Sequence, residues 1–185
     1  MKRSNLILIG ALGAILLFSM AFQLTVNRYA HVIEKRPKTE EWTLDTRNPG
    51  AFAKVNSNSD ITLVYKKDTT SLLEIKSNGI HLDSIITKVE REELKIDILQ
   101  ELKRKDSIAI VITAPTLNGI TLGGKSHFIT QDTLTGTQLK LELKEKSAAS
   151  ILLDYKHVAY TNTSSGTVEI KGSLNQININ NVVEK

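Results

Sequence analysis

The chain has 185 residues, of which 24% are charged and 41% are hydrophobic, enough for one folded domain and a shorter appendage. It contains no cysteine, which excludes disulfide scaffolds, thiolate metal sites and cysteine nucleophiles. Without Lys2 and Arg3, 22 basic residues remain against 20 acidic ones, a balance that excludes the basic face of a nucleic-acid-binding protein.

An apolar segment follows the short basic start of the chain. From Leu6 to Phe22 there is no charged residue and Ser19 is the only polar one, and a helix of this length nearly spans a membrane. We therefore expect residues 1–28 to form one transmembrane helix, with the N-terminus in the cytoplasm. A cleavable signal peptide is the alternative, because Ser19-Met20-Ala21 fits a cleavage site.

Residues 29–47 are polar and charged, with Pro37 in the middle. This composition predicts a tether between the anchor and a folded domain of residues 48–185. Trp42 and Leu44 alternate with polar residues, which is compatible with a first strand. We interpret Trp42 as a cap on the end of the core rather than as a platform for a ligand.

The first half of the domain consists of short apolar runs separated by polar turns. Strands are predicted at residues 51–55, 61–65, 72–76, 85–89 and 108–113. The segment 89–105 is ambiguous, because Leu94, Ile98 and Leu102 share a helical face whereas Leu94, Ile96 and Ile98 share a strand face. The basic run Lys103-Arg104-Lys105 lies beside acidic residues and is interpreted as a solvated turn.

From Gly119 to Asn180, similar blocks recur about every twenty residues. Leu139, Leu141 and Leu143 alternate with polar residues, and the same alternation returns at Ile177 and Ile179. This recurrence predicts an all-β fold in which parallel short strands stack as a β-helix-like solenoid. An antiparallel sandwich with evenly spaced strands remains the alternative.

A longer pattern surrounds the first of these blocks. Residues 110–124 contain an apolar strand, the link Thr113-Ala114-Pro115-Thr116-Leu117, a second strand and a Gly-Gly turn. This stretch resembles the signature of the putative auto-transporter adhesin head GIN domain family. Residues 53–63 and 82–96 also match the family pattern, so the resemblance covers roughly residues 42–185.

The resemblance implies a parallel β-helix-like domain on a bacterial, Bacteroidetes-type cell envelope, and it implies a strand at residues 94–99. The later turns, 146–150 and 163–166, depart from the family's Ser-Gly-Asp pattern. The carboxylates that would ligate calcium are mostly missing from them. We therefore expect no metal site and no cofactor.

No catalytic constellation is evident in the sequence. The four histidines, His31, His81, His127 and His157, lack metal-ligand spacing. Ser126 and His127 with Asp132 or Asp154 would supply the residue types of a triad, but neighbours on a strand point to opposite faces. The acidic residues of the repeats lie among lysines and are interpreted as solvated strand faces: Glu142, Glu145 and Glu169.

These observations predict a membrane-tethered, non-enzymatic binding or scaffolding module of the cell envelope, related to adhesion. The expected location is the bacterial inner membrane, anchored by Leu6 to Phe22, with the domain in the periplasm; release after signal cleavage is the alternative. An envelope protein or polysaccharide is the expected partner, and the edge of the last strand, residues 177–185, is a candidate for self-association. A small carbohydrate-active enzyme and a sensory ectodomain are the alternative functions.

Overall fold

The computed structural model describes Ser19, Gln23 and residues 42–181. The predicted membrane anchor, Leu6 to Phe22, and residues 29–41 of the predicted tether therefore lie almost entirely outside the described residues, whereas residues 43–47 of that tether form a strand. Among the residues that are described, no helix is both long enough and apolar enough to cross a membrane. The chain divides into two compact units, Met1–Glu41 and Trp42–Lys185, and the second unit carries the fold.

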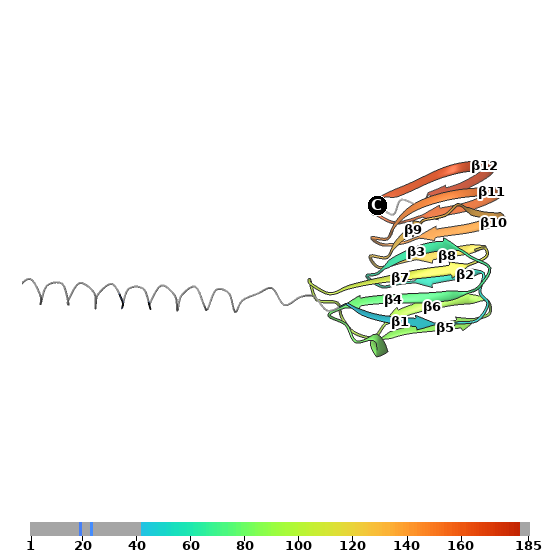
Figure 1. Cartoon of the computed structure of the whole chain (residues 1–185). Coiled ribbons are helices and arrows are strands. Elements are labelled where there is room, and N and C mark those ends of the chain that lie inside the picture. The colour runs from blue at the N-terminus through green and yellow to red at the C-terminus, as the bar shows by residue number, and fades with distance from the viewer. Residues whose placement is uncertain (1–18, 20–22, 24–41, 182–185) are drawn as a thin grey trace, which may run out of the picture. The chain divides into compact units, whose positions relative to one another are not determined.

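Residues 42–181 form an all-β structure, in which twelve strands belong to one sheet (Figure 1). The strands are β1 (Thr43–Arg47), β2 (Lys54–Ser57), β3 (Thr62–Lys67), β4 (Leu72–Asn78), β5 (Ile85–Glu90), β6 (Glu93–Ile98), β7 (Ser107–Ala114), β8 (Gly119–Leu122), β9 (His127–Thr130), β10 (Leu134–Leu143), β11 (Ala148–Asn162) and β12 (Val168–Asn181). A single 3-10 turn, η1 (Leu82–Ser84), precedes β5.

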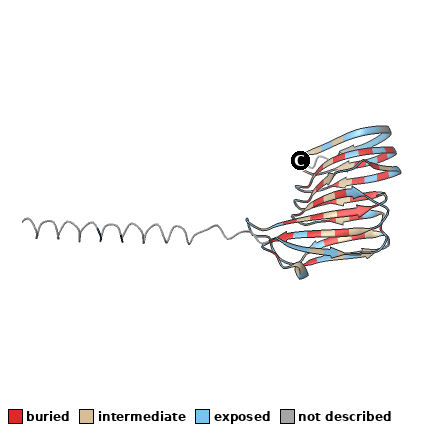
Figure 2. Ribbon diagram, viewed as in Figure 1, coloured by how far each residue is buried: buried red, intermediate tan, exposed pale blue. Residues whose placement is uncertain are grey.

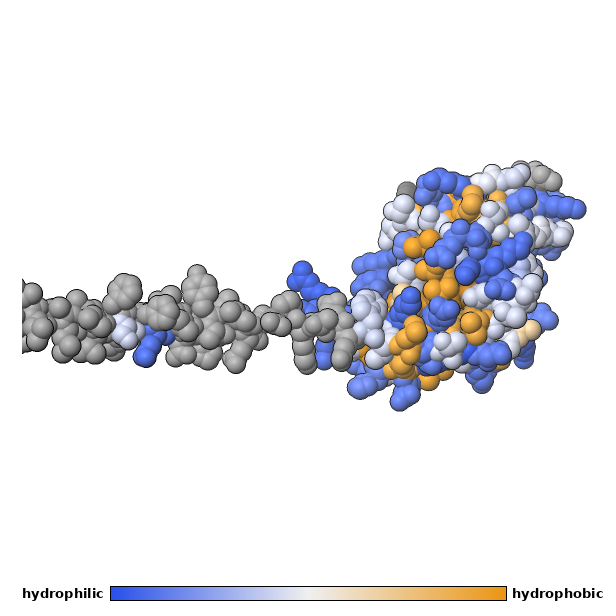
Figure 3. Space-filling model, viewed as in Figure 1, coloured by the Kyte–Doolittle hydropathy of each residue, from blue (hydrophilic) through white to orange (hydrophobic). Residues whose placement is uncertain are grey.

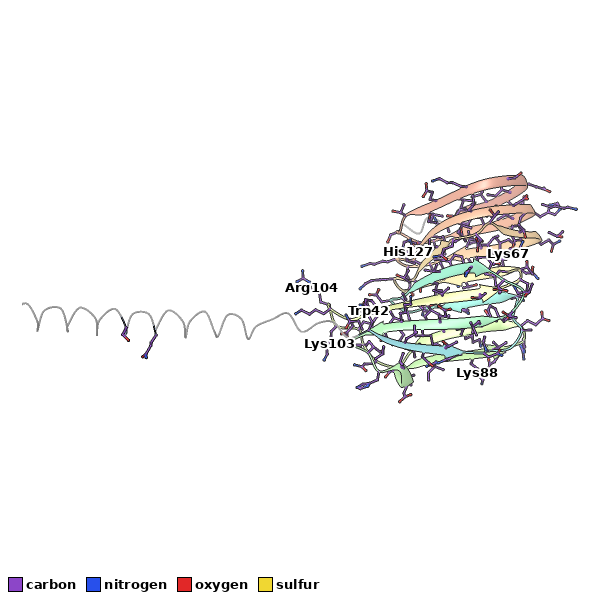
Figure 4. All side chains as sticks on the ribbon, viewed as in Figure 1. Trp42, Lys67, Lys88, Lys103, Arg104 and His127 are labelled. Atoms are coloured by element: carbon purple, nitrogen blue, oxygen red, sulfur yellow. The ribbon has the colours of Figure 1, made fainter. Side chains whose placement is uncertain are left out.

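The ambiguous segment 89–105 contains a strand rather than a helix. Leu94 and Ile96 are fully buried within β6, and Ile98 packs against the same core. The strand alternation therefore describes this segment correctly, as the family resemblance also implied. Lys103 and Arg104 are exposed in the turn that follows, and they project away from the strands (Figure 4).

The sheet curls so that its apolar face becomes the interior. The strand order is β1-β4-β7-β3-β9-β11-β10-β8-β2-β6-β5, and β12 pairs with β11 beside this path. The long strand β11 joins the two arms, since its first residues pair with β9 and the rest pair with β10. Both arms contribute side chains to one continuous core (Figure 2).

The strands at the centre of the sheet are parallel and repeat at the predicted spacing. Gly119 pairs with Lys140, Lys140 with Ala159, and Ala159 with Asn178. In-register stacking aligns like side chains on the inner face, where Val55, Ile120, Leu141 and Tyr160 follow one another across neighbouring strands. All four are buried, so each strand covers the apolar side chains of the next.

The prediction of a uniform parallel solenoid is not what the sheet shows. The pairs β1–β4, β4–β7 and β5–β6 are antiparallel. The physical reason is clearest at β5–β6, where Arg91 and Glu92 both have positive φ, 51° and 62°. Two consecutive left-handed residues close a two-residue hairpin, which reverses the chain instead of carrying it around another coil.

The two ends of the strand order, β1 and β5, are joined by one side chain. The Arg47 guanidinium donates hydrogen bonds to the Leu82 carbonyl at 2.9 Å, the Ile85 carbonyl at 2.5 Å and the Thr87 hydroxyl at 3.1 Å. Its Nε also lies 2.7 Å from Asp45 Oδ2. Arg47 thereby closes this end of the curled sheet where the two margins have no backbone ladder between them.

Candidate functional site

The structure does not assemble the triad that Ser126 and His127 could have suggested. Ser126 is fully buried, and its hydroxyl lies 2.7 Å from the Ser59 carbonyl and 3.1 Å from the Ser57 hydroxyl. Asp132 instead accepts a hydrogen bond from the Lys67 amide at 3.0 Å. The Ser126 hydroxyl therefore joins the turn between β8 and β9 to the neighbouring turn between β2 and β3, and it is not presented as a nucleophile.

The histidines are dispersed. His81 precedes η1, His127 begins β9 and His157 lies on β11, whereas His31 falls outside the described residues. In the part of the chain that the structure describes, no group of three or more His, Asp or Glu side chains could hold a metal ion.

Two of the three acidic residues of the repeats are engaged with lysines, whereas Glu145 does not lie on a strand face: it lies in the turn between β10 and β11 and accepts a hydrogen bond from the Gly124 amide at 2.7 Å. Glu142 lies 2.9 Å from Lys144 and 3.4 Å from Lys140, and Glu169 lies 2.7 Å from Lys171. The hydrogen bond from Lys144 lowers the pKa of Glu142, and the one from Lys171 lowers the pKa of Glu169. A general acid at neutral pH requires a raised pKa, so both carboxylates are shifted in the opposite direction.

One hollow of the domain is a groove of about 830 Å³, most of whose lining residues are polar. It crosses β8, β10, β11 and β12 beside the β7–β8 loop and the start of β2. Its lining residues are Lys54, Thr116, Asn118, Gly136, Thr137, Gln138, Leu139, Lys140, His157, Val158, Ala159, Gln176 and Asn178. We refer to this surface as the polar groove.

Strand register explains why these distant residues meet. One outward row runs from Lys54 through Gly119, Lys140 and Ala159 to Asn178, each paired with the next on a neighbouring strand. Neighbouring parallel strands lie about 4.8 Å apart, so this row places polar side chains at regular intervals along the groove.

A second row runs beside the first. Gln138 pairs with His157, and His157 pairs with Gln176. The His157 Nδ1 atom lies 3.2 Å from the Gln176 side-chain oxygen, so the two side chains orient one another. The polar groove is therefore a two-row array, in which β10, β11 and β12 contribute one residue to each row, and β2 and β8 contribute Lys54 and Gly119 to the first row alone.

Small residues make the groove hollow, and a buried tyrosine makes its floor rigid. Gly119 and Ala159 stand between larger residues in the first row. A Cβ atom at Gly136 would collide with the ring of Tyr155, which lies directly beneath. The Tyr155 hydroxyl donates to the Leu117 carbonyl at 2.5 Å, and burial raises its pKa.

The groove presents hydrogen-bond donors, and some of these donors carry positive charge. Lys54, Lys140 and His157 supply cationic or ionisable nitrogen, and the asparagine and glutamine amides supply both donors and acceptors. The described lining residues include no carboxylate, although Lys140 also lies 3.4 Å from Glu142, and His157 carries their only aromatic ring. Such a surface suits a polar ligand that carries negative charge rather than a neutral sugar stacked on an aromatic platform.

Sequence reasoning missed this site, because its residues are spread from position 54 to position 178. The sequence signal that could have indicated the groove is the set of polar residues that alternate with the apolar ones in the predicted strands. Gln138 and Lys140 flank the buried Leu139, and Gln176 and Asn178 flank Ile177 in the same way.

A second surface feature is a band of apolar side chains that crosses the strands on one face (Figure 3). Val64 occupies an outward position on β3, and it pairs in register with Val111 on β7 and with Ile129 on β9. All three are only partly exposed. Such cross-strand apolar contacts stabilise the sheet.

Comparisons with solved structures show the same fold in proteins of Bacteroides and Parabacteroides species. A putative adhesin from Bacteroides fragilis NCTC 9343 has a TM-score of 0.66 and 22% identity, covering 74% of this chain and 65% of its own. A putative adhesin from Parabacteroides merdae ATCC 43184 has a TM-score of 0.61 and 13% identity, covering 74% of this chain and 60% of its own. The chain thus spans somewhat less than two thirds of these two proteins.

A putative lipid binding protein from Parabacteroides distasonis ATCC 8503 has a TM-score of 0.54 and 13% identity, covering 77% of this chain and 72% of its own. No curated protein matches the sequence. The family model described as "Putative auto-transporter adhesin, head GIN domain" matches residues 51–183, which confirms the resemblance found in the sequence. The chain therefore belongs to the head GIN domain family of putative auto-transporter adhesins.

Proposed function

We propose that the protein is a non-enzymatic binding module of the bacterial cell envelope, whose polar groove holds an acidic polysaccharide. Membership of an adhesin-like family and the fold shared with putative adhesins support a role in contact rather than in turnover. The observation that carries the choice of ligand is the register-aligned array of lysine, histidine and amide side chains on β2, β10, β11 and β12.

The proposal includes a membrane anchor. The apolar segment from Leu6 to Phe22 would hold the chain in the inner membrane, and the domain would face the periplasm. In the proposed arrangement, the stretch before Trp42 spaces the domain from the bilayer, where it meets the polymers of the envelope. The parallel stacking from β8 to β12 would then act as a short solenoid that displays the groove.

The charge of the groove selects an acidic polymer over a neutral one. An acidic polysaccharide repeats its carboxylates along the chain, as the groove repeats its donors along the strands. Each exposed lysine contributes about 0–1 kcal/mol to such an interaction. A single groove therefore binds weakly, and binding weakens further as salt screens the charges.

A lipid ligand, which the Parabacteroides distasonis protein is named for, fits this surface less well. Nine of the thirteen residues that line the groove have polar or charged side chains, and an acyl chain laid along the groove would remove these groups from water.

The experiment measures binding of the full-length protein, held in a neutral detergent, to alginate as a polyuronate probe and to dextran as a neutral polymer. The double variant Lys54→Gln/Lys140→Gln removes both lysines of the groove. The variant Lys103→Gln is the matched control, because Lys103 is an exposed lysine in a turn outside the groove.

We expect alginate to bind the wild type and the control equally, and the double variant up to about 30-fold more weakly, the equivalent of 2 kcal/mol. Equal binding by all three proteins, or preferential binding of dextran, would refute the assignment of the groove. Release of reducing ends from the polymer would instead show an enzyme.

A further inference from the structure

The apolar interior of the sheet ends differently at its two extremities. At one extremity, Arg47 and η1 close the margins β1 and β5. At the other, the inner face of β12 is open: Ile177 is 37% exposed and Ile179 is 54% exposed. The residues paired with them on β11, Val158 and Tyr160, are only 2% and 9% exposed.

Figure 2 shows this contrast along the stack, because the positions of β12 whose burial is described are exposed or intermediate, whereas the strands beneath it carry buried positions. β12 extends from Val168 to Asn181, and among the strands that the structure describes it pairs only with β11. Its other edge therefore presents a long row of backbone donors and acceptors, a feature that favours pairing with another strand.

We propose that this edge pairs with β12 of a second copy of the chain, in antiparallel orientation about a two-fold axis. Such a pair is closed, because each copy covers the open end of the other. A head-to-tail contact would instead bring β12 against the margin that Arg47 already closes.

The bend of the strand defines the register. On β11 both Tyr155 and Val158 point inward, while Lys156 and His157 between them are exposed, so the strand turns from one arm to the other at this place. Gln176 pairs with His157, which locates the same bend on β12 next to Gln176. Two bent strands pair along their whole length only if their bends coincide, so the two-fold axis must pass through this bend.

This register aligns the inward and outward faces of the two β12 strands as well as their bends. It places Ser173 opposite Asn178 of the second copy, and both occupy outward positions because they pair with the exposed Asp154 and Ala159. It places Gly172 opposite Ile179, and both occupy inward positions because they pair with Leu153 and Tyr160. A shift of one residue would oppose an inward position to an outward one.

Shape and charge are compatible with the pair. Gly172 has φ +123°, and a Cβ atom there would clash with the Leu153 carbonyl, so this position carries no side chain against the facing Ile179. The charged residues of β12 are Glu169 and Lys171, both in its first half. Antiparallel pairing sets that half against the uncharged second half of the other copy, so no like charges meet.

Disulfide cross-linking tests this register, because the sequence contains no cysteine and each introduced cysteine is therefore the only one in its chain. Full-length Ser173→Cys and Asn178→Cys proteins are prepared separately in detergent, mixed and oxidised mildly, and the disulfide-linked species are separated under non-reducing conditions. The control mixture contains Ser173→Cys and Lys156→Cys, since Lys156 is also exposed but lies on β11.

We expect the 173–178 mixed disulfide to form several-fold more than either homodimer and several-fold more than the control species. Cross-linking equal to that of the control would overturn the register.

A second measurement tests the pairing itself. Light scattering, with the detergent contribution subtracted, should give a dimer for the wild type and a monomer for Ile179→Lys. The matched control Leu152→Lys, which changes a 40% exposed leucine on β11, should remain a dimer. A monomeric wild type, or a dimer that Ile179→Lys leaves intact, would overturn the proposal, because in the latter case another segment holds the copies together.

Discussion

Arg47 should contribute more to stability than any surface charge of the domain, because it closes the curled sheet. The variant Arg47→Met keeps the aliphatic stem and removes the guanidinium. Three hydrogen bonds to the opposite margin are lost, to Leu82, Ile85 and Thr87. A hydrogen bond to a charged group contributes about 1.5–3 kcal/mol when it is buried.

Partial exposure of the Arg47 side chain lowers the energy expected from these three hydrogen bonds. The Arg47 side chain is 25% exposed, so water replaces part of each bond, and the ion pair with the 34% exposed Asp45 adds at most about 1 kcal/mol. We therefore expect the free energy of unfolding to fall by about 3 kcal/mol, below the roughly 4.5–9 kcal/mol that three fully buried bonds of this kind would contribute.

Urea unfolding of the full-length protein in detergent, followed by the far-ultraviolet circular dichroism of the strands, measures the change. The control Arg104→Met removes an exposed arginine from the turn between β6 and β7, and it should change the free energy of unfolding by less than about 0.5 kcal/mol. A change of less than about 0.5 kcal/mol for Arg47→Met as well would refute the reasoning that this side chain joins the margins.

Two further predictions concern the core. Leu141→Ala truncates a side chain that is 0% exposed and should lower the free energy of unfolding by about 2–5 kcal/mol in the same urea assay; a smaller loss would show that the stacked inner row is loosely packed. Burial raises the pKa of Tyr65 from 10.0 to about 12, and its hydroxyl donates to the Ala114 carbonyl at 2.9 Å. Since the unfolded chain ionises this tyrosine first, the contribution of Tyr65 to stability should be constant below pH 10 and should be lost between pH 10 and 12. Tyr65→Phe should show a shallower fall in urea midpoints over that interval, and an identical fall would assign the effect to other groups.

Alternation along single segments was sufficient to predict the strands of the second half. Leu139, Leu141 and Leu143 are all buried within β10, because a strand with one face in the core requires an apolar residue at every second position. The spacing of about twenty residues also corresponds to the pairing of Leu141 with Ile120 and Tyr160.

The antiparallel margins could not be predicted in the same way. The hairpin of β5 and β6 turns at Arg91 and Glu92, although such turns normally favour glycine or asparagine, so the turn carried no recognisable signal. Strand β6 itself was ambiguous, because the glutamates, lysines and leucines around Leu94 have good helix propensity. Packing of Leu94 and Ile96 into the core outweighs that propensity.

The polar groove could not be predicted from the sequence, for a different reason. Lys54 and Lys140 meet only because β2 and β10 both pair with β8, and this strand order is a property of the whole sheet. Local patterns identify which residues face outward, but they do not identify which outward residues become neighbours.

The central claim is that the polar groove is the binding surface, and hydrogen exchange tests it most directly. Backbone amide exchange of the full-length protein is measured with and without alginate. We predict slower exchange at residues 136–140 and 157–159, which border the groove, and unchanged exchange in β5 at residues 85–90. Protection confined to other strands, or none at alginate concentrations that saturate binding, would contradict the account.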